Sequence, residues 1–316
     1  MANILLTGGS GFVGSAIREA AARRGLEIDA PPRSMLDILR PETLAPAMKG
    51  IDTVVHAAGA AHVFRRTPAT DEWTRRTNVD GTRNVVAAAR AAGVRRVVLV
   101  SSVAVYGDPR DVYAGSKVAA EHLAAEEAGA MTLTMLRLAT VYGEGDPGNV
   151  HRLVRAIDRR RFVWIGRGEN RKSLIHRDDV GAAVVAALAV PEAGVFDVSG
   201  PAVTMAEVVT TIARALGRRV LQIPVGSGAA RSAAHVLTLL TMRNRRAAAL
   251  ERTIAKWLAD DVYDGSPFCA RFGFTPAVAL AEGIAREVAW VRSGATASRR
   301  SSESSGCTPP SRDRAR

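Results

Sequence analysis

The sequence predicts an α/β protein with a doubly wound parallel sheet and a smaller C-terminal α/β lobe. Short apolar runs alternate with helical stretches through the first half of the chain, which is typical of a parallel sheet with helices on both faces. With 47% hydrophobic and 23% charged residues, the 316-residue chain has a globular composition and can bury a sizeable core. We expect a large lobe over 1–143, a smaller lobe over 144–293 that is partly interleaved with the sheet, and a disordered tail over 294–316, where Ser and Arg dominate.

Strands and long helices alternate in the first half. The expected strands are Asn3–Thr7, Leu26–Ala30, Asp52–Ala58, Arg96–Ser101 and Thr132–Arg137. The expected helices between them are Phe12–Arg24, Asp71–Ala92 and Ser116–Glu127.

The second half is expected to contain short strands among helices. The strands are Phe162–Gly166, Ser173–Ile175 and Val195–Ser199. Thr204 and Glu207 have the spacing of a capping box, which predicts a helix from there to Gly217. Two further helices are expected over Arg231–Leu258 and Val278–Arg292.

The net charge of +12 raises the question of a polyanionic partner. Aromatic residues make up only 5% of the chain and do not alternate with the arginine clusters Arg159–Arg161 and Arg243–Arg246, so we expect no nucleic-acid binding. The chain has no apolar run long enough to span a membrane, no signal peptide and only two cysteines, so a cytoplasmic location is expected. The six histidines lack metal-ligand spacing, and no metal site is expected.

Three glycines stand directly between the first strand and the first helix. Gly8, Gly11 and Gly14 have the spacing with which a backbone turns sharply and approaches a pyrophosphate, whose charge the helix N-terminus stabilises. Because the glycines follow a strand and open a helix, they predict a dinucleotide site within residues 1–143.

The end of the second strand indicates which dinucleotide binds. An acidic residue there commonly holds the ribose hydroxyls of NAD, but Ala30–Ser34 contains no acid and instead contains Arg33. A guanidinium suits a 2′-phosphate, so NADP is favoured over NAD; a solvated loop arginine is the alternative. Asp37 is expected either to hydrogen-bond the adenine or to cap the helix that follows.

A serine, a tyrosine and a lysine follow in the next part of the chain. Tyr113 and Lys117 are four residues apart, which on a helix places both side chains on one face. An ammonium beside a phenol favours the phenolate and lowers the pKa of the tyrosine from about 10. A serine at the end of the preceding strand, in Ser101–Ser102, can bond the same substrate oxygen. Together these residues predict proton transfer at a substrate hydroxyl.

With these motifs in this order, the chain resembles extended short-chain dehydrogenases/reductases of the nucleotide-sugar epimerase/dehydratase group, over about residues 1–292. The matching segments are Thr7–Gly14, Asp37–Ile38, His56–Gly59, Asn78–Thr82, Ser101–Gly107, Tyr113–Lys117, Val141–Gly143 and Ser173–Asp179. The resemblance implies an enzyme with a Rossmann-type lobe that binds NAD or NADP and a second lobe that binds substrate. It also implies a homodimer formed through the helices Asp71–Ala92 and Ser116–Glu127.

The resemblance implies roles for individual residues. Tyr113 is the general base and acid on a sugar hydroxyl, Lys117 lowers its pKa and bonds the nicotinamide ribose, and Ser102 orients the substrate oxygen. The residues expected at the cofactor are Gly8, Gly11, Phe12, Val13, Gly14, Arg33, Asp37, Ile38, Ala57, Ala58 and Gly59. Asn78 is expected to support the backbone of the site. The diphosphate of a nucleotide sugar is expected to meet Asn149, Arg171 and Lys172.

The residues after Ser102 narrow the reaction. Sugar 4,6-dehydratases of this family carry an Asp–Glu pair there and decarboxylating relatives carry a glutamate, whereas this chain has Val103–Ala104. The resemblance therefore implies a nucleotide-sugar epimerase that acts through a transient 4-keto sugar, with an NADPH-dependent keto-sugar reductase as the alternative. Oxidation of a steroid-type hydroxyl and a non-catalytic dinucleotide-binding module are further alternatives. Only ten residues separate Ser102 from Tyr113, fewer than is usual in the family, so no particular sugar is assigned.

Overall fold

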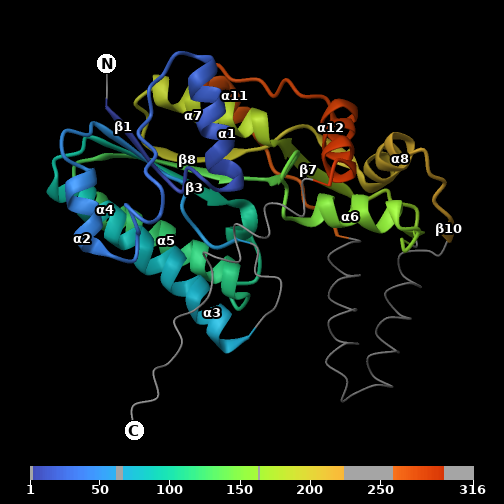
Figure 1. Ribbon diagram of the computed structural model, residues 1–316, viewed down its shortest axis with the longest axis horizontal. Helices are drawn as coiled ribbons and strands as arrows, with labels where there is room; N and C mark the ends of the chain where they lie inside the picture. Colours follow the sequence, from blue (N-terminus) through green and yellow to red (C-terminus); the bar gives the residue numbers. More distant parts are fainter. Residues whose placement is uncertain (1–2, 62–66, 163, 224–258, 295–316) are drawn as a thin grey trace, which may run out of the picture.

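The computed structural model describes residues 3–61, 67–162, 164–223 and 259–294. Its largest sheet is parallel and has the strand order β1-β2-β3-β4-β8 (Figure 1). The strands are β1 (Ile4–Thr7), β2 (Thr53–His56), β3 (Arg96–Ser102), β4 (Thr132–Leu138) and β8 (Gly194–Val198). Every residue of β1 and β2 is buried, because helices cover both faces of the sheet. The predicted α/β fold is confirmed.

The stretch predicted as the second strand, Leu26–Ala30, runs beside β1 but pairs at a single residue. The Leu6 N–H donates to the Asp29 carbonyl at 2.7 Å, and the Asp29 N–H donates to the Ile4 carbonyl at 2.9 Å. Pro31 and Pro32 follow and have no backbone N–H to donate, so the pairing stops there. The prediction of a full strand is wrong, although the segment does lie at the edge of β1.

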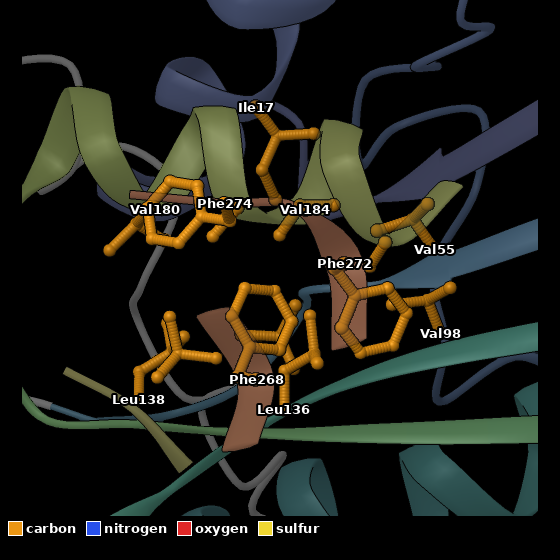
Figure 2. Packing of buried hydrophobic residues seen from close by; sticks show 14 of the residues in the cluster. Ile17, Val55, Val98, Leu136, Leu138, Val180, Val184, Phe268, Phe272 and Phe274 are labelled. Carbon is orange, nitrogen blue, oxygen red and sulfur yellow. The ribbon is translucent and has the colours of Figure 1, made fainter. Parts of the chain in front are cut away.

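Helices α1 (Phe12–Arg23), α7 (Arg177–Ala189) and α11 (Ser266–Phe272) cover one face of the sheet (Figure 1). The core beneath them contains Phe268 and Phe272, whose ring centroids are 4.7 Å apart, packed against strand residues such as Val98 (Figure 2). Helices α1 and α7 pack closely, because a Cβ at Gly181 would lie 2.3 Å from the Ala16 carbonyl oxygen. This packing holds the helix that follows the glycine turn.

The other face is covered by α2 (Pro41–Ala47), α4 (Gly81–Ala91) and α5 (Val112–Ala128). The helix predicted over Asp71–Ala92 is in fact α3 (Pro68–Arg75), a π-helical turn η1 (Arg76–Asp80) and α4. Helix α5 begins four residues earlier than predicted, because the Asp111 carboxylate accepts the N–H groups of Tyr113 at 3.0 Å and Ala114 at 3.2 Å. Tyr113 therefore lies in the first turn of α5.

The smaller lobe has a sheet of β5 (Thr140–Tyr142), β7 (Arg171–His176) and β9 (Ala202–Thr204). Its helices are α6 (Asn149–Asp158), α8 (Met205–Leu216) and α12 (Leu280–Arg292), and a short pair, β6 (Trp164–Ile165) and β10 (Gln222–Ile223), adjoins them. Helix α8 begins with the predicted capping box, in which Thr204 and Glu207 bond each other's backbone N–H, and ends at Gly217 with a φ of 63°.

Residues on both sides of position 143 build the large lobe, because β8 is a strand of its sheet and α7 packs against that sheet. The second half of the chain therefore contributes to the large sheet, as the expected interleaving requires, and the boundary at 143 stays a prediction. The helix predicted over Arg231–Leu258 and the predicted tail beyond Gly294 lie outside the described residues. In the described part of the chain, no helix is both long and apolar enough to cross a membrane.

Candidate active site

The glycine turn after β1 lies against the backbone that follows β2. Gly8 has a φ of 76°, and a Cβ there would lie 2.6 Å from the Ala58 backbone nitrogen. A Cβ at Gly14 would lie 2.0 Å from the Gly8 carbonyl oxygen. The Gly11 N–H donates to that same oxygen at 3.0 Å and closes the turn. A side chain at Gly8 or Gly14 would force the turn open.

The N-terminus of α1 follows this turn directly. Gly11 precedes the helix, no side chain of the described residues caps it, and its first turn contains no acid. The N–H groups of such a turn are available to an anion, and the helix dipole favours negative charge there. Phe12 and Val13 are half-buried in this turn. The turn and the helix end fit the pyrophosphate of a dinucleotide.

A buried histidine lies under the turn, at the end of β2. Thr82 donates its hydroxyl to the Asn78 carbonyl at 2.6 Å, so its oxygen accepts from His56 Nε2 at 3.0 Å, and His56 Nδ1 accepts from the Thr7 hydroxyl at 2.7 Å. Burial, followed by the charge of Lys117, lowers the pKa of His56 to about 3. The ring is therefore neutral, and it links β1, β2 and α4 structurally.

Arg33, Asp37 and Ile38 lie together beyond the turn. The Arg33 Nε donates to Asp37 at 3.3 Å, while the other Asp37 oxygen accepts the Leu39 N–H at 3.0 Å. Ile38 packs against Gly81, where a Cβ would lie 2.5 Å from its Cδ1. The Arg33 side chain is about half exposed, and it pairs with Asp37, the acid expected either to hydrogen-bond the adenine or to cap the next helix.

The backbone of Ala57–Gly59 passes between the glycine turn and the catalytic helix. The Ala57 N–H donates to the Thr7 carbonyl at 3.2 Å, and a Cβ at Gly59 would lie 3.1 Å from Asn78 Oδ1 and 3.8 Å from Lys117 Nζ. Asn78, in the π-helical turn η1, bonds both backbone groups of Ala60 and donates to Ser116 at 2.9 Å. Asn78 thus supports the backbone, as expected.

Ser102, Tyr113 and Lys117 lie at the C-terminal end of β3 and the start of α5. The Ser102 hydroxyl oxygen accepts the Ala104 N–H at 3.2 Å, and the Ser102 side chain lowers the pKa of the Tyr113 phenol, against the larger effect of burial. Lys117 Nζ donates to the Val100 carbonyl at 3.1 Å. Ser102 ends β3, and Tyr113 and Lys117 are one turn apart at the start of α5, so the three residues lie at the same end of the sheet, with Lys117 Nζ near Gly59.

Burial determines the protonation of this group. It raises the pKa of Tyr113 above about 10, and the hydrogen bond with Ser102 opposes that rise. It lowers the pKa of Lys117 to about 8, which the negative charge of Glu121 opposes. The net lowering of the tyrosine pKa that the sequence predicts is therefore wrong for the chain alone, because desolvation of the phenolate outweighs the other contributions.

An ion pair that sequence reasoning missed lies one turn further along α5. Glu121 is 5% exposed and forms a salt bridge of 2.6 Å with Arg137 of β4. Arg137 also donates to the Tyr106 hydroxyl at 2.9 Å, and Tyr106 in turn donates to Asp197 at 2.9 Å. The spacing of Glu121, four residues after Lys117, was the only sequence signal for this network.

The residues expected at the substrate diphosphate lie in the smaller lobe. Asn149 is exposed at the start of α6, and Arg171 and Lys172 are on β7. Arg171 donates to the Ala202 carbonyl at 3.2 Å, and Lys172 forms a salt bridge of 2.5 Å with Asp261. The two cations thus have protein partners, and they lie on the sheet of the smaller lobe, whereas Tyr113 is on α5 against the large sheet.

Comparison with known proteins places these features in a family. The family model described as "NAD dependent epimerase/dehydratase family" matches residues 4–198. The chain is 31% identical to N-acetyl-alpha-D-glucosaminyl-diphospho-ditrans,octacis-undecaprenol 4-epimerase of Escherichia coli O157:H7, over 71% of this chain and 76% of that protein. It is 28% identical to 2-alkyl-3-oxoalkanoate reductase of Stenotrophomonas maltophilia (strain K279a), over 90% of this chain and 97% of that protein.

Among solved structures, the fold is similar to that of MoeE5 in complex with UDP-glucose and NAD. The TM-score is 0.68 at 25% sequence identity, and the match covers 93% of this chain and all of that one. The similarity therefore extends over both lobes.

Proposed function

The chain belongs to the NAD dependent epimerase/dehydratase family, and we propose that within it the protein is an NAD(P)-dependent nucleotide-sugar epimerase that acts through a transient 4-keto sugar. It is an enzyme of the extended short-chain dehydrogenase/reductase type. The observation that carries the proposal is the placement of Ser102 at the end of β3, with Tyr113 and Lys117 one turn apart at the start of α5, next to a glycine turn that has no room for side chains.

Tyr113 is the proposed base. In its phenolate form Tyr113 takes the proton of the C4 hydroxyl as the sugar is oxidised, and Ser102 orients the same substrate oxygen. The ammonium of Lys117 stabilises the phenolate while that proton is in transit. When the keto sugar has rotated in the site and presents its other face, it is reduced again and Tyr113 returns the proton to the C4 oxygen. The protein thus ends in its starting state.

The glycine turn and the first turn of α1 are proposed to hold the pyrophosphate of NAD or NADP, with Arg33, Asp37 and Ile38 at the adenosine and Ala57–Gly59 beneath the dinucleotide. When bound, such a dinucleotide supplies a hydride acceptor that later acts as the donor. The cradle fits this group, because Gly8 and Gly14 leave space only for backbone.

The residues after Ser102 argue against dehydration. Val103 is buried and Ala104 donates its N–H to Ser102, so neither position offers a carboxyl group for proton transfer at neighbouring sugar carbons. A reaction that needs only Tyr113, Ser102, Lys117 and a cofactor remains.

The proposed substrate is a sugar attached to a nucleoside diphosphate. In support, one similar structure holds UDP-glucose and one relative is a 4-epimerase of a diphosphate-linked sugar. Asn149, Arg171 and Lys172 are the proposed contacts, and a diphosphate would compete with Asp261 for the Lys172 ammonium.

A keto-sugar reductase is the second candidate. The relative that aligns with 90% of this chain is a reductase, and reduction uses the same three side chains. Arg33 supports this candidate, because its guanidinium suits the 2′-phosphate of NADPH.

We also propose a homodimer in the cytoplasm. The outer sides of α4 and α5 are the proposed interface, as the family resemblance implies. Two cysteines in 316 residues are typical of a reducing compartment.

The test is to denature the purified protein, identify any released nucleotide by mass spectrometry, and assay UDP-sugars with and without added coenzyme. We expect released NAD(H) and C4 epimerisation of a UDP-sugar without added coenzyme. A protein that releases no nucleotide and consumes NADPH with a keto-sugar nucleotide would instead support the reductase.

A further inference from the structure

We propose that Glu121 is a positioning residue of the site, whose carboxylate keeps the Lys117 side chain in its charged ammonium form beside Tyr113. The inference rests on the proposed function only in assuming that Tyr113 and Lys117 act as a pair. Glu121 follows Lys117 by one helical turn, as Lys117 follows Tyr113, so all three side chains share one face of α5.

Lys117 and Glu121 reach consecutive residues of β3. Lys117 Nζ donates to the Val100 carbonyl at 3.1 Å, and the Ser101 hydroxyl donates to Glu121 Oε1 at 2.5 Å. Since Val100 and Ser101 are adjacent, the ammonium and the carboxylate are held over neighbouring positions of one strand. Glu121 is 5% exposed, so little water screens the attraction between the two charges.

Arg137 forms a salt bridge with the Glu121 carboxylate in this buried position. It pairs with Ser101 in the sheet register, and it donates to Glu121 Oε2 at 2.6 Å from Nη2 and to Oε1 at 3.1 Å from Nε. These hydrogen bonds raise the pKa of Arg137, so the guanidinium stays charged. A paired, fork-like geometry of this kind fixes the position of both side chains.

The pKa of Lys117 lies close enough to neutral pH for a nearby charge to change its protonation. Burial lowers its pKa to about 8, and the negative charge of Glu121 is what opposes that fall. An amine that titrates near pH 8 is still mostly protonated at pH 7, but one that titrates a unit lower is half neutral there. Loss of the Glu121 charge would therefore leave a smaller fraction of Lys117 as the ammonium in the pH range where Tyr113 needs it.

Several other titratable groups lie near this cluster. They are His56 from β2, Tyr106 from η2 (Val103–Tyr106), Arg137 from β4, Asp197 from β8 and Tyr113 from α5 itself. His56 is neutral near pH 7, because its pKa is lowered to about 3. Glu121 is the anion that acts on Lys117.

The experiment exploits the scarcity of lysine. The chain has four, Lys49, Lys117, Lys172 and Lys256, so protein labelled with ¹³C,¹⁵N-lysine gives four side-chain NMR signals whose shifts can be followed against pH. The variant Lys117→Arg assigns the signal. We expect Glu121→Gln to lower the Lys117 midpoint by about one pH unit. Glu126→Gln removes the same charge from an exposed position of α5 and should leave the midpoint unchanged.

An unchanged Lys117 midpoint in folded Glu121→Gln would overturn the proposal. If that variant does not fold, because Arg137 is left without its partner, the double variant Glu121→Gln/Arg137→Gln replaces the ion pair by two amides. The same fall of the midpoint is expected there, whereas Arg137→Gln alone should not reproduce it.

A kinetic measurement separates this role from a merely structural one. In Glu121→Gln the alkaline limb of the kcat/KM profile should move to lower pH together with the NMR midpoint. In Glu121→Asp, which keeps the charge, the limb and the midpoint should stay close to their values in the unmodified protein. The NMR titration needs no substrate. If the midpoint moves as expected but no epimerase activity exists, the proposed function fails while the role of Glu121 stands.

Discussion

Lys117 and Tyr113 have opposite responses to the same burial. Desolvation penalises the charged form of each, so it lowers the pKa of the amine to about 8 and raises that of the phenol. In the chain alone, Lys117 therefore loses its proton at lower pH than Tyr113. The two can act as a charged pair only while the ammonium is preserved, which makes each nearby charge important.

Arg33 tests the choice of coenzyme. Replacing it by alanine removes the guanidinium that Asp37 holds at the proposed 2′-phosphate position, so NADP affinity should fall about tenfold or more while NAD affinity changes little. Coenzyme affinity is measured by calorimetric titration of both dinucleotides. Arg40→Ala is the matched control, because Arg40 is a neighbouring exposed arginine that pairs with Glu42. Equal losses for NAD and NADP in Arg33→Ala would show that Arg33 does not read the phosphate.

At the scale of single residues, the sequence predicts those site residues that lie close together along the chain. Gly8 with Gly14, and Tyr113 with Lys117, are close in the chain, and the geometry of a turn or a helix brings each pair together. The pairing of Glu121 with Arg137 could not be predicted, because it depends on how α5 lies across β4. The packing that buries Tyr113, and so raises its pKa, is likewise a long-range property.

Among the elements, α12 carries an unusual buried acid. Glu287 is fully buried, and its carboxyl accepts the Gly143 N–H at 3.3 Å. Burial, together with the nearby carboxyls of Asp146 and Glu144, raises the pKa of Glu287 to about 9. Glu287 is therefore protonated at neutral pH, and it joins α12 to the loop after β5.

This acid makes stability depend on pH. Between about pH 4.5 and 9 the folded chain holds a proton on Glu287 that the unfolded chain has lost, so the free energy of unfolding falls as pH rises, by at most about 1.4 kcal/mol per unit. Glu287→Gln stays neutral and can still accept the Gly143 N–H. Its unfolding free energy, measured by urea denaturation from pH 6.5 to 8.5, should fall less steeply than that of the unmodified chain.

The control for this measurement is Glu282→Gln, which neutralises an exposed acid on the same helix. Its slope should match that of the unmodified chain. If Glu287→Gln also keeps that slope, the proton on Glu287 does not contribute to stability.

Elements with a strong local signal are predicted well and the others are not. Thr204 and Glu207 mark the start of α8, and the prediction is confirmed because both capping bonds form within one turn. The extended segment Leu26–Ala30 has an apolar pattern, but the prolines after it limit its pairing to Asp29. Helix α11 was not predicted, since it is short and depends on Phe268 and Phe272 packing under the sheet.

On the scale of the whole molecule, the two lobes meet at the proposed cofactor site. Arg177, at the start of α7, donates to Ser15 and Glu19 of α1 and to the Glu144 carbonyl after β5. One guanidinium thus connects the helix behind the glycine turn with the loop of the smaller lobe. The general fold can be predicted from the alternating pattern of strands and helices in the sequence. The contact of Arg177 with α1 could not be predicted in this way, because it joins residues more than 150 positions apart.

The central claim is that Tyr113 performs the proton transfer in a site that also binds a dinucleotide coenzyme. It is tested most directly by comparing Tyr113→Phe with the unmodified protein, in both turnover of a UDP-sugar and affinity for the coenzyme. We predict that turnover falls about 10²-fold or more while the coenzyme dissociation constant stays within about twofold, because phenylalanine keeps the ring but loses the ionisable oxygen. Turnover that survives in Tyr113→Phe would contradict the account.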